Sequence, residues 1–311
     1  MNYNFEEYSF PSADGKHTIY AEIYTPKHVT ARGVVQLAHG MVDHPGRYGN
    51  LIEFLTGRGY IFAGHHHLGH GRSADSAEEL GYFADEGAID LLIADMHTMN
   101  KHLRTTYPAL PLVLLGHSMG SFITRLYAQK HPHSMQGVII HGTGGPNKLA
   151  PLGKLVARAV ALISGKRSRS KLIFSLAFGS YNKKCESGDG ENAWLSRDGE
   201  AIADKVNDPL ASFRFTTKGY IDLFDMVTRC NSREWFDEYP KDMRTLVMSG
   251  DADPVGDYGR GVRYVYKQLM MSGCTDLELR MYEGARHELF NETNRDEVFA
   301  DLGAWLDGTV L

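Results

Sequence analysis

Ser118 stands within the sequence Gly-His-Ser-Met-Gly at residues 116–120, directly after the apolar residues 112–115. An apolar strand that runs into Gly-x-Ser-x-Gly predicts a tight strand–turn–helix elbow, which presents the serine at the carboxyl end of the strand. The flanking glycines relieve crowding in such a strained backbone, and the next helix points its positive end at the site. This pattern predicts nucleophilic attack by the Ser118 hydroxyl. An ordinary turn with a helix-capping serine is the alternative.

A serine hydroxyl is a poor nucleophile at neutral pH unless a base lies beside it. Histidine suits this role because its ordinary pKa, near 6.5, lets it accept and return a proton. Of the 15 histidines, we favour His287, because its loop follows the last expected strand and leaves the same sheet edge as the serine. A carboxylate must orient the imidazole, and residues 249–254, Ser-Gly-Asp-Ala-Asp-Pro, offer two. We predict that Asp253 is this acid, with Asp251 as its rival.

Attack on an ester or amide carbonyl creates an oxyanion, which aimed N–H donors stabilise. We expect one donor to be the backbone N–H of Met119, the residue after the nucleophile. For the second donor we choose the N–H of Met41, because the expected strand at residues 33–38 leads into His39, Gly40 and Met41. His39 and Gly40 let the backbone curl close to a substrate. A plain glycine turn is the alternative.

A third loop, residues 65–73, reads His-His-His-Leu-Gly-His-Gly-Arg-Ser. Together with His39 and His44, this density of histidines raises the question of a metal site. The spacing does not match a zinc-binding helix, and consecutive histidines in a strand point to opposite faces. We therefore expect no metal ion and interpret the loop as a support for the oxyanion turn.

Short apolar runs alternate along the chain with longer stretches of helical periodicity. The expected strands are residues 18–24, 33–38, 60–64, 112–115, 137–141, 245–249 and 277–282. The expected helices are residues 48–56, 86–105, 120–130, 257–271 and 296–306. Several runs are nearly continuous Val, Ile and Leu, which is typical of strands buried on both faces. The alternation predicts an α/β fold with a mostly parallel central sheet flanked by helices.

This alternation stops between residues 146 and 240. An amphipathic stretch occurs there at residues 154–163, a basic segment at residues 166–171, an apolar stretch at residues 172–178 and a helical pattern at residues 217–228. We therefore predict a helical insertion over residues 146–240, carried by a core formed from residues 1–145 and 241–311.

Composition narrows the class of protein. The chain has 311 residues, 33 Lys and Arg against 38 Asp and Glu, and a net charge of −5. This balance argues against nucleic-acid binding, which needs a basic face. The three cysteines indicate no disulfide framework. The chain contains no apolar run of about 18 residues, so we expect no transmembrane segment. Since the N-terminus does not read as a signal peptide, we expect a cytoplasmic protein.

With these residues in hand, the chain resembles the α/β-hydrolases, and more narrowly their monoacylglycerol lipase and lysophospholipase-like group, also called serine aminopeptidase S33-like. The likeness covers nearly the whole chain, and the chain order Ser118, Asp253, His287 is the order of that fold. The segments that carry the likeness are residues 39–48, 69–73, 116–120, 194–198 and 208–210. His66 departs from the pattern, because the group commonly has aspartate before its Gly-His-Gly loop. This change should alter local hydrogen bonding without removing a triad member.

The resemblance implies that the insertion is a lid (cap) and that the acyl chain lies beneath it. Apolar residues of the insertion could line such a pocket, although they could equally bury the insertion's own core. The expected substrate-binding residues are His39, Gly40, His117, Leu152, Leu155, Phe174 and Phe178.

The predicted function is that of a serine hydrolase, which cleaves carboxylic esters through an acyl-enzyme and needs no cofactor. The substrate would be a monoacylglycerol, a lysophospholipid or a short acyl ester. The basic segment at residues 166–171 allows a transient contact with a membrane surface, and the oligomeric state is left open. One alternative is an aminopeptidase that grips an α-amine with acidic lid residues such as Glu186, Asp189 and Glu191. The other is a hydrolase-like binding protein without catalysis.

Overall fold

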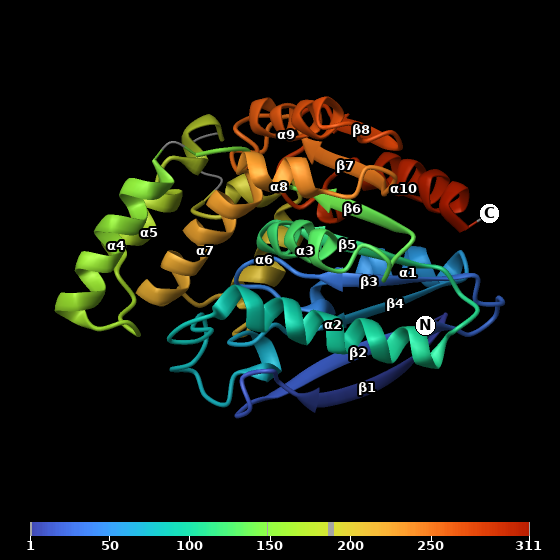
Figure 1. Ribbon diagram of the computed structural model, residues 1–311, viewed down its shortest axis with the longest axis horizontal. Helices are drawn as coiled ribbons and strands as arrows, with labels where there is room; N and C mark the ends of the chain where they lie inside the picture. The colour runs from blue at the N-terminus through green and yellow to red at the C-terminus, as the bar shows by residue number, and fades with distance from the viewer. Residues whose placement is uncertain (1, 148, 186–189, 311) are drawn as a thin grey trace.

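The computed structural model describes residues 2–147, 149–185 and 190–310. Within them, eight strands form one sheet in the order β1-β2-β4-β3-β5-β6-β7-β8 (Figure 1). The strands are β1 (Tyr3–Pro11), β2 (Thr18–Pro26), β3 (Gly33–Ala38), β4 (Tyr60–His65), β5 (Leu112–His117), β6 (Gly137–His141), β7 (Arg244–Gly250) and β8 (Leu277–Tyr282). β2 pairs antiparallel with β1 and β4, and all other neighbours are parallel. The prediction of a mostly parallel sheet is confirmed.

Helices cover both faces of this sheet. The α-helices are α1 (Gly49–Gly57), α2 (Ala88–Thr106), α3 (Met119–Lys130), α4 (Ala150–Ser164), α5 (Lys171–Phe178), α6 (Gly199–Asn207), α7 (Thr217–Cys230), α8 (Arg233–Glu238), α9 (Arg260–Met271) and α10 (Arg295–Val310). The 3-10 helices are η1 (Pro45–Tyr48), η2 (Gly71–Ser73), η3 (Tyr181–Lys184), η4 (Ala193–Leu195) and η5 (Leu289–Asn291). None of the helices in the described ranges combines the length and the apolar character needed to cross a membrane.

The alternation of side chains along each strand creates two separate cores. On β5, Leu112 and Leu114 pack with buried residues of α2, α3 and α9. The residues between and after them, Val113 and Leu115, pack with α1 and α10 on the opposite face. A strand with both faces buried in this way has nearly continuous apolar sequence. Because β3 to β8 run parallel, their carboxyl ends lie at the same edge of the sheet, where the loops that follow them can build a site.

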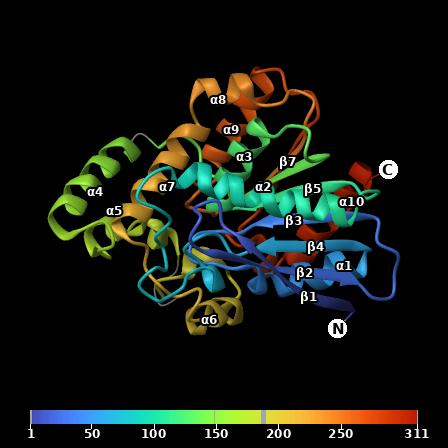
Figure 2. The ribbon, with the colours of Figure 1, turned by 60° about the horizontal axis from the view of Figure 1, so that its bottom comes forward.

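The region between β6 and β7 contains helices α4 to α8 and, in its described part, no strand. α4 packs on α7. Figures 1 and 2 both show α4 and α5 projecting at the end of the molecule opposite the two chain termini. This segment is the one that the sequence analysis treats as an insertion.

Three elements were not predicted from the sequence. β1 is an edge strand with mostly exposed side chains, so it lacks the apolar run that marked the other strands. α6 and α8 are short. The residue before α6 is its N-cap, Asp198, whose carboxylate accepts the N–H groups of Glu200 and Ala201, a helix cap that local sequence can signal.

Candidate active site

Ser118 lies between β5 and α3 with a positive backbone φ of 55°. A residue other than glycine rarely adopts this φ, and the strain persists only where the surroundings hold it. Here the Ser118 N–H donates to the carbonyl of His141 at 3.0 Å. A Cβ on Gly120 would lie 1.9 Å from the carbonyl oxygen of Ala38, so only glycine fits there. Met119 begins α3, and an N–H in a first helical turn has no intrahelical acceptor.

His287 and Asp253 form a buried pair. The Nδ1 atom of His287 lies 2.9 Å from Oδ2 of Asp253, and the two side chains are 2% and 0% exposed. With Nδ1–H donating to the carboxylate, Nε2 carries the lone pair that can accept a proton. Asp251 turns elsewhere, because its carboxylate accepts the N–H of Gly284 at 2.7 Å. The structure therefore brings Asp253, and not its rival, to His287.

The elbow and the base loop approach each other at the same sheet edge. The ring of His117, the residue before Ser118, lies 4.7 Å from the ring of His287 between centroids. A Cβ on Gly142 would lie 3.1 Å from His287 Cε1 and 3.4 Å from His117 Cε1. Within the described ranges, the His287 side chain is hydrogen-bonded to Asp253, and no hydrogen bond joins it to the Ser118 hydroxyl. Catalytic contacts of this kind often tighten only when substrate binds.

The loop after β3 is held against this elbow. The Nδ1–H of His39 donates to the carbonyl of Gly40 at 2.8 Å, and Nε2 accepts the N–H of His67 at 3.0 Å. Because the Gly40 carbonyl and the Met41 N–H belong to one peptide plane, fixing the first also fixes the direction of the second. A Cβ on Gly40 would lie 3.3 Å from the Cβ of Ser118. The structure thus places the proposed donor loop directly beside the elbow.

The histidine-rich loop lies under this turn. His67 Nε2 lies 3.2 Å from the carbonyl oxygen of His39, and its Nδ1 lies 3.2 Å from Nε2 of His65. Desolvation on burial lowers the pKa of His65 to about 3 and that of His70 to about 4. A neutral ring has one donor and one acceptor. His67 therefore donates to the carbonyl and accepts from His65, so the neutral rings brace the turn.

His66 has a carboxylate partner on another strand. Its Nε2 lies 3.1 Å from Oε1 of Glu22 on β2, and its Nδ1 accepts the N–H of Arg72 at 3.3 Å. Glu22 also accepts the hydroxyl of Tyr24 at 2.5 Å. The carboxylate that the resembled group commonly carries at position 66 thus comes from Glu22, a residue that the sequence analysis did not find.

A buried charged cluster also escaped the sequence analysis. Arg47 donates to Asp43 at 2.8 Å and to Glu288 at 3.0 Å, and Tyr48 donates its hydroxyl to Asp43 at 2.8 Å. Burial acts to raise the pKa of Asp43, but the Arg47 guanidinium holds it well below its usual value. Because Glu288 follows His287, this cluster links the loop after β3 to the loop that carries His287.

Aromatic side chains of the inserted region pack over His287. The Trp194 ring lies 5.1 Å from the ring of His287, and the His287 N–H donates to the Trp194 carbonyl at 3.4 Å. Tyr181 packs on Trp194 with 5.0 Å between ring centroids, and Phe178 lies 6.1 Å from Trp194. Neither Tyr181 nor Trp194 was predicted as a site residue. Trp194 lies in the segment 194–198, where the resemblance was the available signal.

The predicted acyl-pocket residues separate into two groups. Phe178 belongs to the aromatic cluster over His287, and Phe174 packs on it with 5.7 Å between ring centroids. Leu152 and Leu155 are 58% and 64% exposed on α4. The structure therefore brings the phenylalanines, but not these leucines, to the roof of the site.

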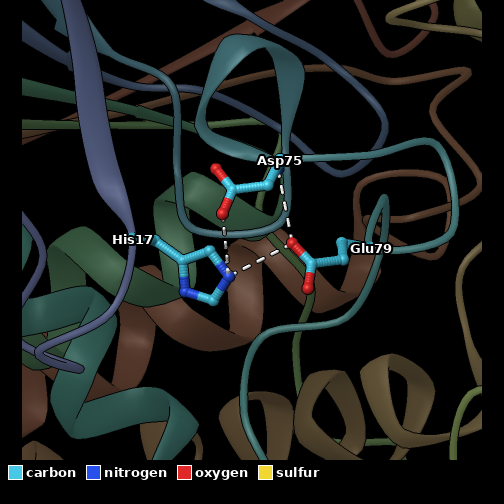
Figure 3. A group of neighbouring side chains, drawn as sticks. All are labelled: His17, Asp75 and Glu79. Atoms are coloured by element: carbon cyan, nitrogen blue, oxygen red, sulfur yellow. Dashed lines mark hydrogen bonds and ion pairs between the residues drawn. The ribbon is translucent and has the colours of Figure 1, made fainter.

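One group of metal-ligating side chains occurs among the described residues. His17 Nε2 lies 3.1 Å from Glu79 and 3.9 Å from Asp75 (Figure 3). Its Nδ1 lies 2.5 Å from Asp14. None of the proposed catalytic residues belongs to this group. A protonated His17 would form ion pairs with these carboxylates.

Comparison with known proteins places this chain in a family. The family model described as serine aminopeptidase, S33, matches residues 29–294. The chain belongs to this S33 family. Among its relatives is a monoacylglycerol lipase of Mycolicibacterium smegmatis, 28% identical and matched over 96% of each chain. The human monoglyceride lipase is 26% identical, matched over 95% of this chain and 88% of its own.

A solved structure shares the fold of this chain. A thermostable carboxyl esterase from Bacillus coagulans has a TM-score of 0.91 and 32% identity, with 99% of each chain covered. The predicted α/β-hydrolase fold and the resemblance to monoacylglycerol lipases are confirmed. As for the aminopeptidase alternative, Glu186 and Asp189 lie outside the described residues, and Glu191 is exposed.

Proposed function

We propose that this S33-family protein is a serine hydrolase of carboxylic esters, with Ser118 as nucleophile, His287 as general base and Asp253 as the acid that orients it. Similarity to lipases and to a carboxyl esterase supports the ester-hydrolase class. The observation that supports these roles is the buried 2.9 Å contact between His287 Nδ1 and Asp253, at the same sheet edge as the strained Ser118 elbow.

In the proposed mechanism, His287 Nε2 takes the hydroxyl proton as Ser118 Oγ attacks the ester carbonyl carbon. The carbonyl electron pair moves onto oxygen, and the resulting oxyanion accepts hydrogen bonds from the N–H groups of Met41 and Met119. Collapse of this intermediate expels the alcohol, which takes its proton from His287, and leaves an acyl-Ser118. Water then attacks the acyl carbon with the same histidine as base, and the acid is released.

The proposed substrates are monoacylglycerols, lysophospholipids and short acyl esters. We further propose that residues 146–240 form a lid above the site, because Phe178 and Trp194 lie in this region and pack over the base. The exposed apolar side chains on α4, on the residue that precedes it and on α5 support a transient contact with a lipid surface. They are Leu149, Leu152, Leu155, Leu162, Ile163, Leu172 and Leu176.

The basic segment at residues 166–171 is less available for that contact. Lys166 pairs with Asp85 at 2.7 Å, and Arg169 donates to the carbonyl of Ala77 at 2.9 Å. These bonds tie the segment to the loop before α2. The lipid contact is therefore better assigned to the exposed apolar residues than to these cations.

The test is covalent labelling combined with a substrate series. A fluorophosphonate probe should modify Ser118 in the wild-type protein, as located by peptide mass spectrometry. The same protein should hydrolyse nitrophenyl esters of increasing acyl length, a monoacylglycerol and a lysophospholipid, but not amino-acid arylamides. Absence of labelling would favour a non-catalytic binding protein, and faster arylamide cleavage would favour an aminopeptidase.

A further inference from the structure

Lys205 is a buried cation on α6, a helix that the sequence analysis missed. Its side chain enters the core below the inserted region, and the residue is 9% exposed. Nζ donates to the carbonyl oxygen of Val42 at 2.7 Å. Val42 has a φ of 54°, which a β-branched residue adopts only under strain. This hydrogen bond therefore holds the oxyanion loop in a conformation that its own sequence disfavours.

The charges around Lys205 explain why a lysine is buried there. The cluster of Asp43, Arg47 and Glu288 contains two carboxylates and one guanidinium. Lys205 interacts electrostatically with all three, and its charge balances the second carboxylate. Removing one member of such a buried set leaves an uncompensated charge, which is costly. A small cavity is lined by members of this cluster, Asp43, Arg47 and Glu288, and by His117, the residue before Ser118.

A second contact joins the same part of the inserted region to the same loop. Asp208 follows the end of α6, and its carboxylate lies 2.6 Å from Nε2 of His44. Lys205 and Asp208 therefore hold the loop at Val42 and at His44. Both attachments come from residues distant in sequence from the loop that they hold.

Met41 stands between two anchored carbonyl groups. On one side, His39 of the core holds the carbonyl of Gly40 at 2.8 Å. On the other side, Lys205 of the inserted region holds the carbonyl of Val42. The Met41 N–H shares a peptide plane with the Gly40 carbonyl, and only the four soft dihedrals of Met41 and Val42 separate that plane from the plane of the Val42 carbonyl. Anchoring both carbonyls therefore restricts the turn that carries the Met41 N–H.

We propose that Lys205 is a positioning residue of the oxyanion hole, so that the inserted region completes the hole as well as covering the substrate. This inference rests on the proposed function, in which Met41 is an oxyanion donor. Lys205 itself contacts neither substrate nor the reacting atoms. Its loss should weaken binding of the transition state more than binding of the ester, and should therefore lower kcat rather than raise KM.

The test compares Lys205→Met with wild type on a water-soluble nitrophenyl ester. Removing a complete oxyanion donor costs about 10²–10³-fold in kcat, and a misplaced donor should cost less, so we expect kcat to fall about 10- to 100-fold with KM within about 3-fold. Affinity for a trifluoromethyl ketone, which forms a tetrahedral oxyanion on the serine, should fall in parallel. Lys205→Arg keeps the charge and should recover part of both losses.

The matched control is Lys218→Met. Lys218 is also a largely buried lysine of the inserted region, paired with Asp222 at 2.5 Å on α7, and its removal should leave kcat and ketone affinity within about 3-fold of wild type. If Lys205→Met does not fold, Lys205→Gln, which is shorter and uncharged, replaces it, and we expect the same losses of kcat and ketone affinity. The inference would be overturned if the folded Lys205 variant had the same kcat, or the same affinity for the ketone, as wild type. Failure of the proposed function would look different, since wild type itself would then neither turn over the ester nor bind the ketone.

Discussion

The floor and the roof of the site are built in different ways. At the floor, Ser118, Asp253 and His287 stand on loops at the carboxyl ends of the parallel strands β5, β7 and β8, and Asp253 and His287 are almost completely enclosed. The roof is made by helices whose inner side touches the base through Trp194 and whose outer side exposes residues such as Leu162. A rigid floor suits chemistry that needs fixed geometry, while a helical roof can vary with the substrate.

The largest effect should come from the nucleophile at the floor. In Ser118→Ala, we expect kcat to fall by about 10⁶-fold with every ester, because no acyl-enzyme can form. Steady-state hydrolysis by purified protein measures this loss. Ser9→Ala, on the exposed edge strand β1, is the control and should keep wild-type turnover. Substantial ester hydrolysis by Ser118→Ala would show that the chemistry lies elsewhere.

The next effect should come from the acid that orients the base. Asp253→Asn should lower kcat by about 10⁴-fold, because the amide favours the wrong imidazole tautomer. Asp251→Asn is a close control: its carboxylate contacts the Gly284 N–H, and an amide oxygen can still accept that bond. We expect its kcat to stay within about 3-fold of wild type. Equal losses in the two variants would remove the distinction that the structure draws between them.

Because His65 in the histidine-rich loop is buried and neutral, we predict that the free energy of unfolding depends on pH. Burial lowers the pKa of His65 to about 3, whereas the unfolded chain has a histidine pKa near 6.5. Below pH 6.5 the unfolded state therefore binds a proton that the folded state refuses, and stability is lost as the pH falls toward 3. At pH 5 this one residue should cost about 2 kcal/mol relative to pH 7.

Urea unfolding at the two pH values measures this effect by difference. The change in unfolding free energy from pH 7 to pH 5 should be smaller in His65→Gln than in wild type by about 2 kcal/mol. His133→Gln, at an exposed position, should change nothing. If wild type and His65→Gln lost the same stability on acidification, His65 would not be a buried neutral histidine.

The smallest effect on chemistry should come from the outer roof. Leu162 and Ile163 are 89% and 87% exposed, so replacing both with serine should change the unfolding free energy by less than about 0.5 kcal/mol. Hydrolysis of a soluble short ester should be unchanged. Sedimentation with phosphatidylcholine vesicles should weaken severalfold, because apolar side chains drive interfacial binding. Unaltered vesicle binding would remove the lipid-contact role from this end of α4.

Much of the floor of the site could be predicted from local sequence. The elbow was predictable because Gly-x-Ser-x-Gly after an apolar strand reflects a local requirement of the backbone: the serine adopts a positive φ, and the tight turn needs glycines beside it. The loop with Asp253 was predictable because it follows an apolar run typical of a buried strand. The loop with His287 follows residues 277–282, where apolar and charged residues alternate as in a half-buried strand. The roof was less predictable, and Leu152 and Leu155 show why: an apolar residue on a helix can face either a pocket or solvent.

The sequence by itself determined the α/β alternation, the order of the three candidate catalytic residues and the extra helical segment, because periodicity and turn chemistry are local properties. The sequence favoured Asp253 over Asp251, and the tertiary structure brings Asp253 to His287. Tertiary structure alone decided that Glu22 pairs with His66 and that Lys205 holds Val42. These are contacts between side chains whose loops meet only after the strands have paired. Burial then decides their charge states, since desolvation acts on a group only where the fold has enclosed it.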